Sequence, residues 1–280
     1  MLDFLIRGGV VADGTGTPLH ESHVGIGGDR IVFVGNGEPA AAQVIDADGL
    51  IIAPGFIDTH SHSEFTLLAD GRAEGKICQG VTTEISGNCG LSAAPLLGEA
   101  MQRREEDLRE LGIAERWSTF TQYFSLLESR GISLNFATLC GHGNIRGSVM
   151  GYRNRRPDPG DMTRMKSLLA EALRDGAKGL STGLIYPPGV YAETEELVAL
   201  ARGLSDVPCG IYASHMRSEG DALIEAIGEV VTIGRRARIP VHVSHLKTSG
   251  EQNWWKRGDA VECLEEARRS GVQVTCDRYP

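Results

Sequence analysis

From residue 56 onward, the sequence alternates short apolar segments with longer stretches whose apolar residues recur at helical spacing. Strands that alternate with helices form parallel sheets with right-handed crossovers. The pattern therefore predicts an α/β fold built on a parallel sheet. Seven segments are predicted to be its strands: Phe56–Thr59, Val81–Ile85, Leu134–Leu139, Gly179–Thr182, Gly210–Ser214, Val241–Ser244 and Val272–Cys276.

The stretches between these strands carry helix signals. Residues 161–175 are the clearest, because their apolar side chains share one helical face and Gly176 supplies a C-terminal stop. Residues 194–204, 221–236 and 259–269 show the same pattern. Residues 99–116 are so highly charged that we expect an exposed helical excursion there.

Seven strands of this kind approach the eight of a (β/α)8 TIM-like barrel, whose active site lies at the C-terminal strand ends. A doubly wound open sheet would carry a glycine-rich phosphate-binding turn after its first strand, and none follows Phe56–Thr59. We therefore favour the barrel. Because the sequence ends at Pro280, directly after the seventh predicted strand, we expect residues 54–280 to form an incomplete barrel, truncated after that strand.

The first 53 residues have a different character. Leu2–Val11 alternates loosely between apolar and polar residues, and two further strand candidates, His23–Ile26 and Arg30–Val34, flank a Gly27-Gly28-Asp29 turn. Such a turn between alternating segments is a good hairpin signal. We predict that residues 1–53 are the N-terminal part of a small β-sandwich domain, which Pro54-Gly55 separates from the barrel.

Composition limits the partners and the compartment. Lys and Arg total 28 against 37 Asp and Glu, a formal net charge of −9, which disfavours binding to nucleic acid or anionic membranes. The sequence shows neither an apolar run of about 18 residues nor a signal peptide at its start. The six cysteines are dispersed without a C-x-x-C pair, which argues against a disulfide framework. We expect a cytoplasmic protein of unknown oligomeric state that acts on a small molecule.

Four histidines stand at the ends of three predicted strands. His60 and His62 follow the first strand, and their period-two spacing sends both imidazoles to one side. His215 and His245 end the fifth and sixth strands. A lone histidine at a strand end is more often structural, and an H-x-H pair is common on surfaces and in cores. Four of the chain's eight histidines at one barrel rim nevertheless indicate a metal site. His242, inside the sixth strand, is interpreted as a packing residue.

Cys89 lies in a glycine-rich turn, Ser86-Gly87-Asn88-Cys89-Gly90, just after the second predicted strand. The flanking glycines suit a bend that aims the side chain into the barrel mouth, and a thiolate is a good zinc ligand. A cysteine in such a turn can also be inert, or serve as the nucleophile of a Cys–His protease. The protease needs one imidazole rather than four, so we favour the metal ligand.

Several of these motifs together resemble the N-acyl-D-amino-acid deacylases (D-aminoacylases) of the metal-dependent amidohydrolase superfamily. The resemblance is collinear and covers essentially the whole chain. The residues that carry it are Ala53-Pro54-Gly55-Phe56-Ile57-Asp58-Thr59-His60-Ser61-His62, Ser86-Gly87-Asn88-Cys89-Gly90, Gly141-His142-Gly143, Ser181-Thr182-Gly183-Leu184, Ser214-His215-Met216-Arg217 and Ser244-His245-Leu246-Lys247.

The resemblance implies zinc-dependent hydrolysis of the amide bond of N-acyl-D-amino acids to a D-amino acid and a carboxylate. Cys89, His215 and His245 would hold a tightly bound Zn²⁺, while His60 and His62 would form a second, weaker site. Many barrel amidohydrolases bridge two metals with a carboxylated lysine at the end of the fourth strand. Lys178 is at the wrong end of that strand, and Cys89 would take the lysine's place.

The resemblance also implies substrate-binding and catalytic roles. Lys247 and Tyr186 match positions that hold the substrate's α-carboxylate. The family's catalytic aspartate lies on the eighth strand, which would be beyond Pro280, and Asp277 is not a match for it. Two alternatives stay open: a cyclic-amide hydrolase of the hydantoinase or dihydroorotase kind, and an inactive zinc-binding fragment. The preferred D-amino acid side chain and the number of metals are not predicted.

Overall fold

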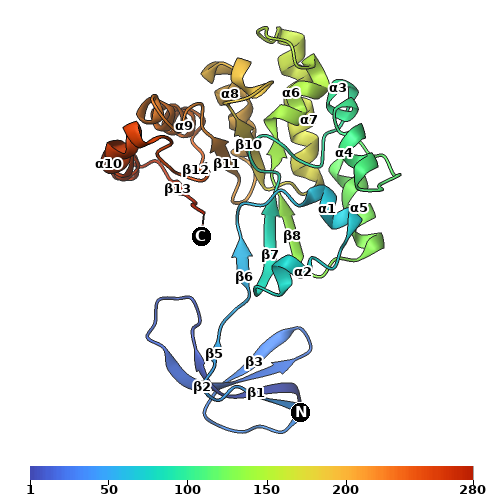
Figure 1. The fold of residues 1–280 in the computed structure, drawn as a ribbon, viewed down its shortest axis with the longest axis vertical. Coiled ribbons are helices and arrows are strands. Elements are labelled where there is room, and N and C mark those ends of the chain that lie inside the picture. The colour runs from blue at the N-terminus through green and yellow to red at the C-terminus, as the bar shows by residue number, and fades with distance from the viewer. Residues whose placement is uncertain (280) are drawn as a thin grey trace. The chain divides into compact units, whose positions relative to one another are not determined.

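The structure is a computed structural model that describes residues 1–279. It divides into two compact units, Met1–Phe56 and a second unit that begins at Ile57. The first unit contains only strands, and the second combines parallel strands with helices (Figure 1). The prediction of an α/β fold is confirmed. Within the described residues, no helix is both long and apolar enough to cross a lipid bilayer.

Two expectations concern the end of the sequence. Pro280, which we took as the point where the barrel is truncated, lies outside the described residues. The catalytic aspartate that the family resemblance places beyond Pro280 lies outside them as well. Both expectations therefore stay predictions.

The first unit is one sheet in the order β3-β2-β1-β4, with β5 paired to β1. The predicted hairpin is confirmed, since β2 and β3 are antiparallel around a turn at Gly28, whose φ is +60°. β1 also pairs in parallel with β4 and β5. Its strands are β1 (Leu2–Val11), β2 (His20–Gly27), β3 (Arg30–Gly35), β4 (Ala41–Asp46) and β5 (Ile51–Ile52).

The second unit contains two sheets, in the orders β6-β7-β8 and β13-β12-β11-β10-β9. Every registered strand pair in them is parallel. All seven predicted strands are present, one of them divided in two, so that the described part of this unit has eight strands. Their bounds are β6 (Phe56–Asp58), β7 (Val81–Ser86), β8 (Asn135–Thr138), β9 (Cys140–Gly141), β10 (Gly179–Gly183), β11 (Ile211–His215), β12 (Val241–Val243) and β13 (Val274–Cys276).

One predicted strand, Leu134–Leu139, is divided at Leu139. Its first part, β8, pairs with β7, and the short continuation β9 pairs with β10. Backbone hydrogen bonds continue across the division. Leu139 N–H donates to Ser86 O at 2.9 Å, and Lys178 N–H donates to Thr138 O at 2.8 Å. The seven predicted strands therefore follow one another in sequence order from β6 to β13.

Helices connect the strands of the second unit (Figure 1). All four helices predicted with amphipathic periodicity are present, with α7 and α8 through α10 close to the expected bounds. The α-helices are α1 (Glu64–Ala69), α2 (Glu74–Ile77), α3 (Gly98–Gln102), α4 (Glu105–Glu110), α5 (Phe120–Arg130), α6 (His142–Met150), α7 (Pro159–Asp175), α8 (Thr194–Ala201), α9 (Leu223–Ala237) and α10 (Arg257–Arg269). Three 3-10 segments are η1 (Gly189–Tyr191), η2 (Arg202–Leu204) and η3 (Glu251–Lys256).

The expectation of one exposed helical excursion at residues 99–116 is wrong in part. This region forms two short helices, α3 and α4, and Leu108 of α4 is completely buried in the core. Its charged residues satisfy one another locally: Arg104 pairs with Asp107, and Arg116 pairs with Glu105. The high charge of the sequence thus predicted only the exposed side of α4. It gave no indication that Leu108 on the other side is buried.

The core lies between the strands and the helices that cover them. On β12, Val241 and Val243 are fully buried, and α9 packs against this strand. Successive side chains of a strand point to opposite faces. His242 consequently points away from the helix layer, toward the face that carries the polar residues at the strand ends.

Candidate metal centre

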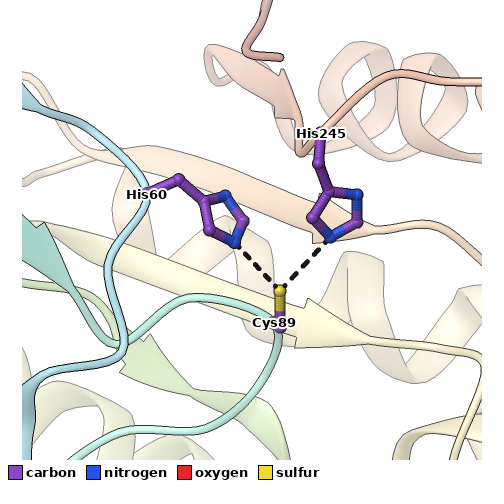
Figure 2. A group of neighbouring side chains, drawn as sticks. All are labelled: His60, Cys89 and His245. Atoms are coloured by element: carbon purple, nitrogen blue, oxygen red, sulfur yellow. Dashed lines mark hydrogen bonds between the residues drawn. The ribbon is translucent and has the colours of Figure 1, made fainter. Parts of the chain in front are cut away.

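The C-terminal ends of the parallel strands bring the predicted ligands together. His60 follows β6 by two residues, Cys89 lies in the loop after β7, His215 is the last residue of β11, and His245 follows β12 by two residues. Figure 2 shows His60 and His245 pointing from either side at the sulfur of Cys89. Residues from distant parts of the sequence thus meet at one rim because parallel strands end on the same side.

Cys89 is the centre of the tighter cluster. Its Sγ lies 3.2 Å from Nε2 of His60 and 3.4 Å from Nε2 of His245. These three ligand atoms lie within 4.8 Å of one another. Zinc–sulfur and zinc–nitrogen bonds of about 2.3 and 2.0 Å at tetrahedral angles separate ligand atoms by about 3.5 Å. The observed spacings are close to that value.

The loop that carries Cys89 is held in an unusual backbone conformation. Cys89 has φ +55°, between Gly87 at +76° and Gly90 at +75°. Ser181 of β10 fixes both ends of the turn: its hydroxyl donates to Gly87 O at 2.5 Å and accepts from Gly90 N–H at 3.0 Å. A side chain at position 90 would meet the backbone nitrogen of Gly183 at 2.6 Å. The positive φ values agree with the bend that the flanking glycines predicted, and the lack of space at position 90 is a second reason for glycine there.

A second cluster adjoins the first through His245. His215, Glu219 and His245 each offer a ligand atom within 4.8 Å of the others, and the two imidazole centroids are 4.4 Å apart. Nε2 of His215 is buried without a hydrogen-bond partner among the described residues. Burial, followed by repulsion from His245, lowers the pKa of His215 to about 4. At neutral pH its imidazole is therefore uncharged, with a lone pair available for a metal.

Two carboxylates complete the site, and the sequence analysis identified neither as part of it. Asp277 Oδ2 lies 3.0 Å from Nδ1 of His60 and 3.0 Å from Nε2 of His242. Glu219 Oε1 lies 2.8 Å from Nδ1 of His245. The available signals were Asp277 directly after the seventh strand and Glu219 four residues after His215.

Both carboxylates are ionised although they are partly buried. Burial opposes ionisation, but hydrogen bonds from His242 and His60 hold the pKa of Asp277 well below its usual range. For Glu219, hydrogen bonds from His245 and Lys247 likewise outweigh burial and lower the pKa to about 2. His242 therefore contacts a site carboxylate, which its interpretation as a packing residue did not include.

The remaining predicted site residues are near the centre but not in the clusters. The ring of His62 is 5.3 Å from that of His60, and no donor atom of His62 belongs to either cluster. Tyr186 donates its hydroxyl proton to Cys89 O at 2.5 Å. Lys247 Nζ forms an ion pair with Glu219 at 2.5 Å. The predicted division into a Cys89–His215–His245 site and a His60–His62 site differs from this grouping and stays a prediction.

The donor set fits zinc. Sulfur and imidazole ligands are those that Zn²⁺ prefers in proteins, and the orphaned Nε2 of His215 has no other partner in the described part of the chain. In the absence of a metal, burial and the neighbouring Asp277 and Glu219 raise the pKa of Cys89 to about 12. A bound cation would reverse this balance, because coordination deprotonates a thiol.

Comparison with known proteins agrees with this chemistry. The amidohydrolase family model matches residues 43–277. The chain belongs to the amidohydrolase family. It is 39% identical to a D-aminoacylase of Alcaligenes xylosoxydans xylosoxydans over 99% of this chain and 57% of that protein. It is also 39% identical to an N-acyl-D-glutamate deacylase of the same organism, over 100% of this chain and 57% of the relative. The chain thus spans a little over half the length of these relatives.

Solved structures show the same relationship. A D-aminoacylase crystal structure superimposes with a TM-score of 0.91 at 36% identity, covering 100% of this chain and 59% of the other. An N-acyl-D-glutamate deacylase from Bordetella bronchiseptica, complexed with zinc and a phosphonate inhibitor, has a TM-score of 0.93 at 37% identity and covers 100% and 58% of the two chains. The resemblance to the D-aminoacylases inferred from the motifs is confirmed.

Proposed function

We propose that the whole protein is a zinc-dependent N-acyl-D-amino-acid deacylase, which hydrolyses the amide bond to a D-amino acid and a carboxylate. The observation that carries the proposal is the buried Cys89 sulfur within 3.4 Å of two imidazoles from different strand ends. It occurs in a chain that is 39% identical to both a D-aminoacylase and an N-acyl-D-glutamate deacylase. The chemistry of the donors and the family relationship support the same activity.

The described residues would share the work as follows. Following the two clusters rather than the predicted division, we place His60 with Cys89, His215 and His245 as residues that would hold the zinc. His62 would then serve a second, weaker site. Bound zinc supplies Lewis-acid polarisation of the scissile carbonyl and lowers the pKa of a water molecule from about 15.7 to roughly 7. Lys247 and Tyr186 would orient the substrate's α-carboxylate. Fixing the carboxylate and carbonyl together leaves one direction for the side chain, which would select the D-enantiomer.

We also propose that β6 to β13 form part of a (β/α)8 barrel and that residues 1–53 belong to a small β-sandwich domain. The parallel pairing in sequence order supports the first proposal, and the separate N-terminal sheet supports the second. The proton-transferring aspartate expected from the family resemblance would come from an eighth strand, beyond Pro280. Asp277 contacts His60 and His242 instead.

A cyclic-amide hydrolase is the second candidate within the same family. An allantoinase of Rubrobacter xylanophilus is 27% identical to the chain. An L-hydantoinase superimposes with a TM-score of 0.62 at 17% identity, a likeness that shows the fold alone. The C-terminal end of β10 carries Thr182 and Gly183, while Lys178 precedes the strand. The C-terminal end of β10 therefore offers no lysine that could bridge two metals, and this favours the deacylase.

The test is a matched substrate comparison with the whole protein. Purified protein should contain zinc by elemental analysis and hydrolyse N-acetyl-D-amino acids, with far lower activity on the L-enantiomers and on hydantoins. Preference for hydantoin or another cyclic amide would establish the second candidate. Bound zinc without hydrolysis of any of these amides would support a zinc-binding protein that is not a deacylase.

A further inference from the structure

Glu219 lies between the candidate metal ligand His245 and Lys247, the lysine that is predicted to bind the substrate. Its side chain comes from the loop after β11 and is 10% exposed. One of its oxygens, Oε1, lies 2.8 Å from Nδ1 of His245 and 2.5 Å from Nζ of Lys247. The same oxygen is 3.8 Å from Nε2 of His215. A single carboxylate oxygen therefore faces the Lys247 ammonium and the imidazoles of two histidines.

Lys247 and Glu219 compete for one atom of His245. Lys247 Nζ is 2.9 Å from Nδ1 of His245, close enough to donate a hydrogen bond. Each nitrogen of a neutral imidazole carries either a proton or a lone pair. If Nδ1 carries the proton, it donates to Glu219 and Nε2 keeps its lone pair. If Nδ1 accepts from Lys247, the proton moves to Nε2, which faces Cys89.

We propose that Glu219 is a positioning residue that selects the Nδ1–H tautomer of His245 and so keeps the Nε2 lone pair directed at the metal. This inference rests on the proposed zinc-dependent function. A carboxylate that accepts a hydrogen bond from one ring N–H of a ligand histidine fixes the tautomer. It also makes the other ring nitrogen more basic. Glu219 would also draw the Lys247 ammonium away from Nδ1, because the carboxylate is the stronger acceptor.

The arrangement at His60 supports the inference independently. His60 directs Nε2 at Cys89, at 3.2 Å, and Nδ1 at Asp277, at 3.0 Å. His245 directs Nε2 at Cys89, at 3.4 Å, and Nδ1 at Glu219, at 2.8 Å. Both imidazoles beside the sulfur therefore have a carboxylate on the far nitrogen. Only at His245 does a lysine of the described chain compete for that nitrogen.

The same geometry leaves Lys247 prepared for a substrate. An ammonium has three N–H donors. One reaches Glu219, and one reaches the backbone oxygen of His245 at 3.1 Å. The third remains for the α-carboxylate of the substrate. Glu219 thus ties the orientation of a substrate-binding residue to that of a metal ligand.

The test is a double-mutant cycle read out as zinc affinity, measured by competition with a chromophoric chelator on the whole protein. Glu219→Ala should weaken zinc binding by about 10- to 100-fold, the usual effect of losing an outer-shell partner. Glu219→Gln keeps a neutral acceptor and should fall between Glu219→Ala and the wild type. Lys247→Met should strengthen zinc binding more in the Glu219→Ala background than in the wild type, because it removes the competing donor only where Glu219 no longer controls Nδ1.

Glu195→Ala is the matched control, since Glu195 forms an exposed ion pair with Arg236 and its loss should leave zinc affinity unchanged. Circular dichroism in the presence of a chelator establishes that each variant is folded. Cobalt substitution adds a spectroscopic readout, because a weakened site should lose intensity in the thiolate-to-cobalt charge-transfer band.

Zinc affinity of Glu219→Ala equal to that of the wild type would overturn the inference, as would an equal gain from Lys247→Met in both backgrounds. If the wild type binds zinc but hydrolyses no N-acyl-D-amino acid, the proposed function fails while the affinity series still decides the role of Glu219. A wild-type protein that binds no zinc would overturn both.

Discussion

At the residue scale, Cys89 combines a backbone conformation with positive φ and a buried side chain. Its positive φ and the two flanking glycines aim the sulfur at His60 and His245. Burial and nearby carboxylates disfavour the free thiolate by raising the pKa of the thiol, so the position is poorly suited to a nucleophile that must ionise without help. A ligand that ionises on coordination is the consistent role.

Replacing Cys89 by serine tests this role. Cys89→Ser keeps the size of the side chain but removes the soft thiolate donor. Zinc affinity should fall by more than the about 10- to 100-fold typical of losing an outer-shell partner, and activity of the whole protein should fall with it. Chelator competition measures the first, and Cys78→Ser, an exposed cysteine, is the matched control. Full zinc affinity in Cys89→Ser would contradict the assignment.

Sequence patterns singled out four histidines and Cys89 as candidate ligands but did not single out Glu219 and Asp277. Four histidines at three strand ends form a set whose recurrence is informative. A single carboxylate in a polar loop resembles the many solvated acids of a chain with 37 Asp and Glu. Which acids fold back onto an imidazole depends on the conformation of the loop after the strand, and periodicity carries no information about that.

At the element scale, the strands were predictable because each is a short apolar run between turn residues. The division between β8 and β9 was not, because it arises from pairing with different neighbours, β7 and β10. α6 was also missed. Its sequence, HGNIRGSVM, contains two glycines and three polar residues that are buried, so it lacks the amphipathic pattern by which helices are recognised.

The start of α7 offers a stability prediction at this scale. Asp158 caps the helix by accepting from Asp161 N–H at 2.8 Å, and Asp161 accepts from Asp158 N–H at 3.0 Å. Asp158→Ala removes one half of this capping box and should lower the free energy of unfolding by about 1 kcal/mol. Urea denaturation measures the change. Asp158→Asn keeps a capping oxygen and should lose less; an equal loss in both variants would contradict the capping role.

The ionisation of Glu64, in the first turn of α1, should make the stability of the protein depend on pH. Its Oε1 accepts from Gly87 N–H at 2.7 Å, two residues before Cys89. Burial raises the pKa of Glu64 to about 7 from an ordinary value of 4.5. The folded state thus holds this proton to a higher pH than the unfolded state does. Its contribution to stability is present below pH 4.5, declines as the pH rises toward 7 and is lost above that.

Glu64→Gln keeps the acceptor for Gly87 N–H and removes the titration. Relative to the wild type, the variant should gain about 2 kcal/mol in the free energy of unfolding between about pH 5 and about pH 8. Urea denaturation at both pH values, with a chelator present to remove metal effects, measures this difference. A constant difference between variant and wild type at the two pH values would show that Glu64 does not titrate in this range.

At the scale of the whole molecule, the site joins segments that are far apart in the sequence but belong to one unit. The candidate ligands come from the loops after β6, β7 and β12 and from the end of β11, all in the unit that begins at Ile57. Neither metal cluster includes a residue of the described Met1–Phe56 unit. A bound cation would therefore cross-link the strands of the second unit and leave the N-terminal sheet without a direct contribution.

Removing the metal should consequently destabilise one unit selectively. A ligand that binds only the folded state, present at about 100 times its Kd, stabilises that state by about 2.7 kcal/mol. For a unit of this size, that corresponds to a rise in Tm of about 5 to 10 °C. Zinc should raise the Tm of chelator-treated protein by this amount and slow hydrogen exchange in β7, β11 and β12, with little change in β1 to β3.

Cys89→Ser should show neither effect, because it lacks the sulfur that lies beside both His60 and His245. An equal Tm shift in Cys89→Ser, or equal protection of the N-terminal sheet, would mean that zinc stabilises the protein elsewhere than at this centre.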